Sequence, residues 1–372
     1  MTTEEKLHGP GSTFCLPGTG EFGPALKESD EGSSLPFVSV ILPTWCEEKY
    51  IDNCLRSVLH QNYPIFRMEI LVVDGMSTDR TRDIVRTVAA EFPQVRLLDN
   101  PERLQSYGLN RAIQASRGTI IIRMDAHSEY GPDYIRTCVD TLRRTGADNV
   151  GGPQRPKART FFQRMIAHAL GSRLGTGGAP CRHEGQDGYV DTVFPGAFRR
   201  QALQRVGLFD PGAITNEDAE INQRIIASGG KVYLSSQIEC YYYPRESVRS
   251  LAIQYFRYGR GRARTVLKHG QVLRLSSFLP FLFFSSILGM AALSTLLPQA
   301  IMGALALGGF YLSCLIAESV RLALKTEWRC AFVLPVVFAT MHFSHAVGVG
   351  WGVLYYSHNP DWTHTSPPLL QQ

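Results

Sequence analysis

Two long uncharged stretches near the C-terminal end constrain this 372-residue chain most strongly. Neither Leu275–Ala317 nor Cys330–Pro360 contains Asp, Glu, Lys or Arg. A helix that crosses the hydrocarbon core of a bilayer needs about 20 apolar residues. Because Pro298-Gln299 divides the first stretch, we expect a membrane anchor over 275–357. Its three predicted transmembrane helices cover about 278–297, 300–317 and 331–356.

Basic residues between the predicted spans indicate how the chain is oriented. Arg321, Lys325 and Arg329 lie between the second and third spans, whereas the Pro298-Gln299 turn is uncharged. Loops rich in Lys and Arg stay in the cytoplasm. We therefore expect a multi-pass protein of the cell (inner or plasma) membrane, with a cytoplasmic N-terminal domain and the tail 358–372 outside. The alternative is a buried hairpin in a soluble protein.

The charge of the remaining chain points to lipid and away from nucleic acid. The net charge is only +5, and the basic excess gathers just before the first span. We interpret 246–274 as a basic amphipathic segment at the membrane interface, facing anionic lipid head groups. The eight cysteines form no CxxC pair, which argues against a zinc site or a disulfide framework.

The N-terminal part divides into a tail and one domain. Residues 1–36 are rich in Gly, Pro, Ser and Glu and lack the apolar core of a signal peptide, so we expect a disordered tail. In 37–245, apolar strand patterns alternate with helical patterns, which predicts an α/β domain with a parallel, doubly wound sheet. The predicted strands are 38–43, 68–74, 95–98 and 119–124.

Acidic residues follow these strands where each one ends. Glu47 comes after the first strand, Asp74 ends the second, Asp125 follows the fourth, and His127 lies two positions further on. Ligands of such sheets bind beyond the carboxyl ends of the strands. The sequence therefore predicts a polar site at this edge, although a single Asp after a strand is usually a turn residue.

Four segments of the chain resemble the landmarks of a known enzyme family. They are VSVILPTWCEEKYIDNCLRSVLHQNYP, EILVVDGMSTDRTRDIV, LNRAIQASRGTIIIRMDAH and NEDAEINQRI. Together they resemble the family 2 glycosyltransferases, which have the GT-A fold and use nucleotide-sugar donors. DTVFPGAFRRQALQRVGLFDP and YYYPRESVRSLAIQYFRYGRGRAR further resemble the exopolysaccharide-type membrane enzymes of succinoglycan biosynthesis. The resemblance covers about 37–265.

The resemblance implies a nucleotide site at the ends of the first two strands. Asp74 corresponds to the acidic residue that contacts the donor's pyrimidine, and Pro43, Thr44 and Glu47 lie in the loop that lines the same pocket. The family usually has two Asp before Gly and Ser, whereas here Asp74 is followed directly by Gly75.

The resemblance also implies a divalent metal. Asp125-Ala-His127 stands where the family has Asp-x-Asp, so Asp125 and His127 are expected to hold Mg²⁺ or Mn²⁺ at the donor diphosphate. Imidazole suits manganese better than magnesium. The alternative for His127 is an ordinary surface residue after a strand.

Asp218 matches the family's catalytic base, at the start of a helix that begins in Asn-Glu-Asp. An inverting transfer needs a carboxylate that takes the proton of the acceptor hydroxyl. We expect the helix N-terminus to lower the pKa of Asp218; the alternative is that Glu217 and Asp218 only favour the helix dipole. Glu217 and Gly196, which follows a strand-like stretch at 190–194, are placed on the acceptor side.

Arg257 and Tyr258 stand in the register of the Gln-x-x-Arg-Trp motif of processive members, with Tyr in place of Trp. By this resemblance Arg257 binds the donor's departing diphosphate and Tyr258 stacks on the acceptor sugar. The alternative is a basic helix that only lies on the membrane.

The resulting prediction is an inverting, metal-dependent hexosyltransferase. It would move a hexose from a nucleotide-sugar, a UDP-hexose, to a membrane-bound, lipid-linked saccharide or glycan acceptor in polysaccharide or glycolipid biosynthesis. The alternatives are a processive polysaccharide synthase and a catalytically silent, membrane-anchored sugar-nucleotide binder.

Overall fold

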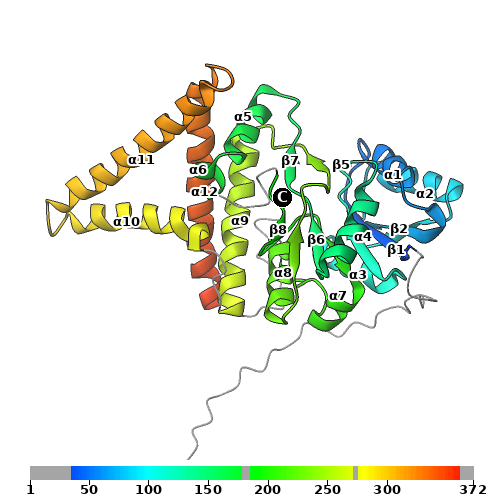
Figure 1. Ribbon diagram of the computed structural model, residues 1–372. Helices are drawn as coiled ribbons and strands as arrows, with labels where there is room; N and C mark the ends of the chain where they lie inside the picture. Colours follow the sequence, from blue (N-terminus) through cyan, green and yellow to red (C-terminus); the bar gives the residue numbers. More distant parts are fainter. Residues whose placement is uncertain (1–34, 178–184, 214, 271–274, 361–372) are drawn as a thin grey trace, which may run out of the picture.

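The computed structural model describes residues 35–177, 185–213, 215–270 and 275–360 (Figure 1). The two tails predicted at the ends of the chain lie almost wholly outside these residues. Within the described part, an α/β domain is followed by a group of long helices.

An eight-stranded sheet in the order β3-β2-β1-β4-β9-β6-β10-β8 forms the centre of the α/β domain. Strands β1 to β4 run parallel, as predicted. However, β9 is antiparallel to β4 and β6, and β8 is antiparallel to β10. The prediction of a parallel sheet is therefore wrong for the second half, where the alternation of long strands and helices stops. The strands are β1 (Val38–Thr44), β2 (Met68–Asp74), β3 (Val95–Asp99), β4 (Ile120–Arg123), β6 (Asn149–Gly151), β8 (Gly188–Tyr189), β9 (Ala197–Arg199) and β10 (Val232–Leu234).

Helices cover both faces of this sheet, which explains why its strands are apolar throughout. Successive side chains of a strand point to opposite faces: Val40 and Leu42 of β1 pack in one core cluster with α1, α2 and α4, and Ile41 packs in another with α3 and α8. The helices of the domain are α1 (Ile51–Leu59), α2 (Thr81–Glu91), α3 (Gln105–Ala115), α4 (Tyr134–Thr145), α5 (Phe161–Leu170), α6 (Arg173–Thr176), α7 (Arg200–Val206) and α8 (Glu217–Ala227).

The predicted strand-like stretch 190–194 is not a strand. Its Val193 is buried in the core, but the ladder resumes only at Ala197, in β9. Pro195 has no N–H to donate to a neighbouring strand. A separate three-stranded sheet, β5-β11-β7, borders this region. It consists of β5 (Ser128–Tyr130), β7 (Gln154–Pro156) and β11 (Cys240–Tyr242).

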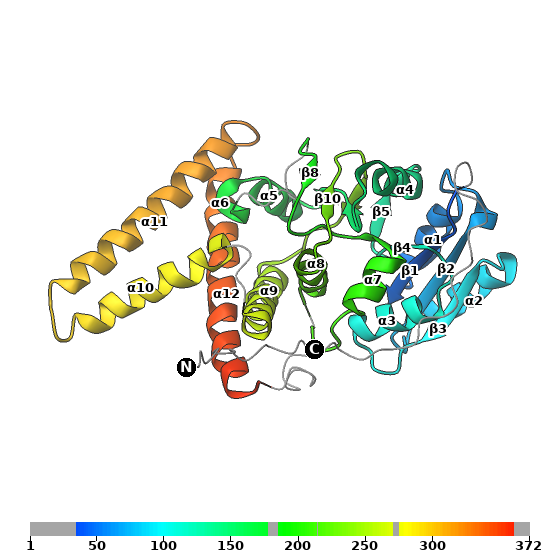
Figure 2. The same ribbon diagram turned by 60° about the horizontal axis from the view of Figure 1, so that its bottom comes forward.

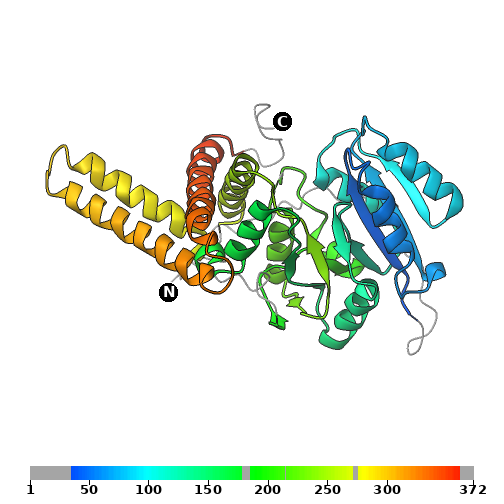
Figure 3. The ribbon, with the colours of Figure 1, turned by 90° about the horizontal axis from the view of Figure 1, so that it is seen from above.

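Four long helices complete the described chain: α9 (Val248–His269), α10 (Leu279–Leu293), α11 (Ala300–Ala323) and α12 (Cys330–His358). Three segments are long and apolar enough to cross a membrane: Leu275–Leu293, Ala300–Ala323 and Cys330–His358. Figures 1, 2 and 3 show α9 and α12 side by side, with α9 against the α/β domain. The α10–α11 hairpin points away from that domain.

The backbones of α9 and α12 touch because glycine stands at their contacts. A Cβ on Gly259 would lie 2.1 Å from the carbonyl oxygen of His345, and one on Gly348 would lie 2.1 Å from that of Phe256. Small residues allow such close helix packing. The contact ties the apolar helix α12 rigidly to the helix that borders the α/β domain.

We expect Gly348→Ala to lower the thermal unfolding temperature of the protein in detergent, by overpacking worth about 1–3 kcal/mol. The matched control is Gly308→Ala on α11, where a Cβ would meet nothing within 4 Å. Alanine favours a helix over glycine, so the control is expected to be neutral or slightly stabilising. Equal unfolding temperatures for both variants would contradict the close contact.

Candidate functional site

A buried arginine at the end of β4 joins the two halves of the site. Arg123 is 2% exposed. Its Nη1 donates to Glu217 Oε1 at 3.0 Å and to both carboxylate oxygens of Asp218 at 2.8 Å. Its Nε donates to Asp125 Oδ1 at 3.3 Å. The predicted metal residue and the predicted base therefore share one guanidinium group, which also lies over the Phe194 ring, 4.9 Å from its centroid.

Helix α9 is fixed directly beside the start of α8. Thr215 Oγ1 donates to the carbonyl of Arg257 at 2.9 Å, and Asn216 Nδ2 donates to that of Tyr258 at 3.0 Å. A Cβ on Gly261 would lie only 2.5 Å from Thr215 Oγ1. Since α8 begins at Glu217, the structure brings the predicted residues of α9 next to the predicted base.

Burial decides the protonation of Asp218. It raises the pKa of Asp218 to about 7; Arg123 opposes the shift, while Glu217 and Asp125 add to it. The expectation that the helix N-terminus lowers this pKa is wrong, because loss of solvent and two neighbouring carboxylates outweigh the helix dipole. These carboxylates raise the pKa of Arg123 well above its usual value although burial opposes it. A carboxyl group that titrates near neutral pH is suited to general base chemistry.

The loops after β1 and β2 are joined by hydrogen bonds. The backbone N–H of Cys46 donates to Ser77 Oγ at 2.8 Å, and that of Glu47 donates to Thr81 Oγ1 at 2.8 Å. Glu47 Oε1 lies 3.0 Å from His127 Nδ1, and this bond raises the pKa of His127. Two of the residues predicted to converge at the sheet edge therefore do meet.

Asp74 is enclosed rather than open to a ligand. It is 0% exposed, and its carboxylate accepts hydrogen bonds from the N–H and hydroxyl of Ser77. Arg82 contacts the same carboxylate at 2.7 Å and bridges to Asp99 at 2.7 Å. In this structure Asp74 holds the turn after β2.

Thr44 and its neighbours shape the adjoining loop. Thr44 is buried and Pro43 is partly buried, and the carbonyl of Thr44 accepts the N–H of Gly75 at 2.8 Å. Trp45, beside Gly75, is 60% exposed.

The predicted metal residues are each bonded to a different partner. Asp125 contacts Arg123, and His127 contacts Glu47. Among the residues that the structure describes, no group of three or more His, Cys, Asp or Glu side chains is arranged to hold a metal ion. A metal at this edge would therefore need the donor diphosphate, or a shift of side chains, to complete its ligands.

Close packing explains why residue 196 is a glycine. A Cβ at this position would lie 2.6 Å from the Phe198 ring and 2.7 Å from Asn149 Oδ1. Its carbonyl accepts the N–H of Arg123 at 3.0 Å. Gly196 is thus next to the central arginine, and its acceptor-side role stays a prediction.

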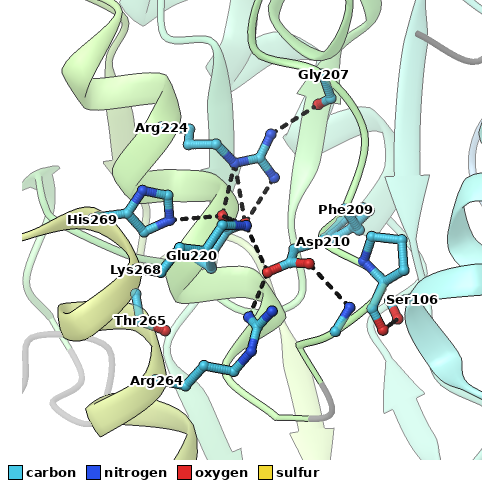
Figure 4. A network of polar contacts seen from close by, with 12 residues as sticks. Ser106, Gly207, Phe209, Asp210, Glu220, Arg224, Arg264, Thr265, Lys268 and His269 are labelled. Carbon is cyan, nitrogen blue, oxygen red and sulfur yellow. Dashed lines mark hydrogen bonds and ion pairs between the residues drawn. The ribbon is translucent and has the colours of Figure 1, made fainter. Parts of the chain in front are cut away.

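Part of the basic segment points into the protein. Arg260 and Arg264 are 2% and 3% exposed. Arg264 and Lys268 contact Asp210 at 2.5 and 2.7 Å (Figure 4). These residues do not face lipid head groups, contrary to the expectation for the whole of 246–274: Arg264 and Lys268 pair with a carboxylate of the α/β domain, and Arg260 is buried.

The same network holds α8 from its buried side. Glu220, in the first turn of α8, contacts Arg224 at 2.7 Å and His269 of α9 at 2.9 Å (Figure 4). Arg224 also donates to the carbonyls of Val206 and Leu208. The helix that carries Asp218 is therefore bonded to α9 and to the loop after α7.

The sequence analysis missed Arg123, Trp45 and this network. An arginine within the apolar run 119–124 was the available signal for the first, because a buried charge needs partners. No local signal pairs Asp210 with Lys268, which is 58 residues away.

Comparison with known proteins decides the family. Residues 39–208 match the family described as "Glycosyl transferase family 2". The succinoglycan biosynthesis protein ExoA of Rhizobium meliloti (strain 1021) is 32% identical over 286 residues, 75% of this chain and 86% of that protein. The chain belongs to glycosyltransferase family 2.

Two further comparisons agree with this assignment. A dolichyl N-acetyl-alpha-D-glucosaminyl phosphate 3-beta-D-2,3-diacetamido-2,3-dideoxy-beta-D-glucuronosyltransferase of Methanococcus voltae is 29% identical over 327 residues, 86% of this chain and 97% of that one. The solved mannosyltransferase PcManGT from Pyrobaculum calidifontis has a TM-score of 0.57 and 24% identity, covering 86% of this chain and 88% of its own. The predicted family and its GT-A fold are confirmed.

We expect Glu220→Gln to destabilise this glycosyltransferase by about 3 kcal/mol at pH 7, because Arg224 and Lys268 lose a buried anion. Although burial opposes it, Arg224, His269 and Lys268 lower the pKa of Glu220. The stabilisation is therefore complete above the unfolded pKa of about 4.3 and is lost as pH falls below it. When unfolding temperatures are measured against pH, the difference between wild type and Glu220→Gln should therefore shrink at acid pH.

Glu102→Gln is the matched control, since Glu102 pairs with Arg111 at the surface. Such pairs contribute about 0–1 kcal/mol. A Glu220→Gln variant no less stable than Glu102→Gln at pH 7 would contradict the role of the network.

Proposed function

We propose that this protein transfers a hexose, with inversion, from a nucleotide-sugar to a membrane-bound, lipid-linked saccharide acceptor in polysaccharide or glycolipid biosynthesis. The observation that carries the proposal is the carboxylate of Asp218, held by Arg123 at the start of α8 beside Arg257 and Tyr258. The names of the relatives, in succinoglycan biosynthesis and in transfer to a dolichyl-linked sugar, support the acceptor class.

Asp218 acts as the general base in this proposal. It takes the proton of the acceptor hydroxyl while that oxygen attacks the anomeric carbon, and the bond from this carbon to the donor's diphosphate breaks on the opposite side, releasing the nucleoside diphosphate. With a pKa near 7, the carboxylate is ionised in a substantial fraction of molecules and is still basic enough to accept a proton. Arg123 holds both oxygens of the carboxylate and so fixes its direction.

The other predicted residues surround this base. Arg257 lies in a positive region, since burial and its neighbours Arg260 and Arg245 lower its pKa. Such crowding of cations favours binding of the donor's diphosphate. Tyr258 stacks on the acceptor sugar, while Glu217 and Gly196 border the acceptor side.

The donor side is formed by the loops after β1 and β2. Pro43, Thr44 and Glu47 line it, and Asp74 contributes through the turn that it holds with Ser77. The exposed ring of Trp45 offers a flat apolar surface to the base. We propose a UDP-sugar as donor. We also propose that the catalytic domain is cytoplasmic, because nucleotide-sugars are made in the cytoplasm and because the basic residues Lys325 and Arg329 are exposed between α11 and α12.

The residues at the sheet edge fit a divalent ion, Mg²⁺ or Mn²⁺. Asp125 offers a carboxylate, and Glu47 bonds Nδ1 of His127, which leaves Nε2 to face a metal. When bound, such an ion offsets the charge of the donor diphosphate and of the leaving group. The solved mannosyltransferase is in complex with GDP-Man and Mn²⁺, which supports metal use.

We expect Asp218→Asn to reduce turnover at least about a hundredfold, as loss of a general base does, with nucleotide-sugar binding retained. Release of UDP by membranes, with native lipid extract and a panel of UDP-sugars, measures turnover; protection from thermal unfolding by the donor measures binding. The matched control is Asp83→Asn on the exposed surface of α2.

Turnover unchanged by Asp218→Asn would remove this residue from the base role. Donor binding by wild type without turnover on any lipid extract would instead indicate a silent sugar-nucleotide binder. A ladder of added sugars in the product would indicate a processive synthase.

We expect His127→Asp to shift the metal preference from Mn²⁺ towards Mg²⁺, because it replaces an imidazole with a second carboxylate. The measurement is the ratio of turnover with each ion after removal of bound metal by a chelator. His60→Asp, at an exposed position after α1, is the control. An unchanged ratio would show that His127 does not contact the metal.

A further inference from the structure

The apolar helix α12 is covered by the rest of the protein along its whole length. Buried positions run from Cys330 to Tyr356, a span of about 39 Å in a helix. The first half packs in one cluster with α5, and Gly348 and Gly352 contact α9. The hydrocarbon core of a bilayer is only about 30 Å thick. The contact is therefore longer than a membrane is thick.

Helix α9 lies between the second half of α12 and the catalytic domain, and α5 of that domain packs against the first half. Leu251 packs in the cluster with α5, the carbonyl of Arg257 is bonded to Thr215, and Arg264 pairs with Asp210. If α12 crossed a bilayer, the start of α8 and these ion pairs would lie at the depth of the hydrocarbon. Lipid-exposed irregular backbone does not occur at that depth, and ionic groups there are costly.

The outward side of α12 carries a continuous apolar stripe. Its large side chains are 44% to 71% exposed and recur every three, four or seven residues, as on one face of a helix. They are Phe332, Val336, Phe343, Val347, Trp351 and Leu354. A half-covered helix with such a stripe has the pattern of a helix that lies at a membrane interface.

The hairpin leaves the protein from this same side. The rings of Phe284 in α10 and Phe343 in α12 are 5.8 Å apart, and Tyr311 of α11 is 3.0 Å from His342. Figures 1 and 3 show α10 and α11 extending away from α12, opposite the catalytic domain. Whatever surrounds the apolar hairpin therefore also meets the stripe of α12.

We propose that α12 lies along the membrane surface with its stripe among the lipids, and that only the α10–α11 hairpin enters the bilayer. The residue after α12, Asn359, is then on the same side as the catalytic domain. Three crossings would place it on the opposite side. The proposal concerns the position of the fold on the membrane and does not depend on the reaction.

Cysteine labelling in sealed membrane vesicles tests this topology. The experiment uses vesicles whose catalytic domain faces outward, which labelling of the exposed Cys46 verifies. Peptide mass spectrometry measures the labelling of each cysteine separately. We expect Asn359→Cys to react with a membrane-impermeant maleimide as completely as Lys325→Cys, which lies on the catalytic side in either topology. Gln299→Cys, at the hairpin tip, should react only after detergent. Asn359→Cys reacting only after detergent, like Gln299→Cys, would overturn the proposal.

The depth of the stripe is an independent test with substitutions at exposed positions. Nitroxide labels at Val336→Cys, Val347→Cys and Leu354→Cys report depth through collisions with oxygen and with a water-soluble nickel complex. We expect one common depth near the head groups. A crossing helix would spread the outer two labels over roughly 27 Å, and a spread of more than half of that would overturn the proposal.

Discussion

The site depends on one buried cation, Arg123, that is shared by three carboxylates. Asp125, Glu217 and Asp218 all contact its guanidinium group. Without it, three carboxyl groups would lie together in a region of low dielectric, where each favours the neutral form of the others. One side chain therefore both fixes the proposed base and connects it to the strand end at which the metal is proposed.

Three carboxylates surround one arginine, so this part of the site has an excess of acidic groups. The excess of negative charge would attract the divalent ion that is proposed to bind at this edge. In the proposed function the diphosphate is bound on the other side of the site, by Arg257 of α9. Proton transfer and phosphate binding are then assigned to elements of opposite charge.

The sequence predicted what local pattern controls. Alternating apolar runs placed β1 to β4 close to their observed bounds, and motif spacing placed Asp218 at the first turn of a helix. It did not predict the environment of Asp218, because its partner Arg123 is 95 residues away. The pKa was judged from the helix end alone, while burial and neighbouring carboxylates act through the tertiary fold. The prediction that all basic residues before the anchor face lipid was wrong for the same reason, because Asp210 and Glu220, which pair with Lys268, are distant from it in the sequence.

The inward direction of Arg260 and Arg264 changes the kind of force that holds this enzyme to lipid. Arg264 pairs with Asp210 inside the protein and Arg260 is buried, so contact with a membrane is left chiefly to the apolar hairpin and to the aromatic and aliphatic side chains around it. Attraction to lipid phosphates is screened by salt, but contact between apolar surfaces is not. We therefore expect binding of the protein to a membrane to depend little on ionic strength or on the fraction of anionic lipid.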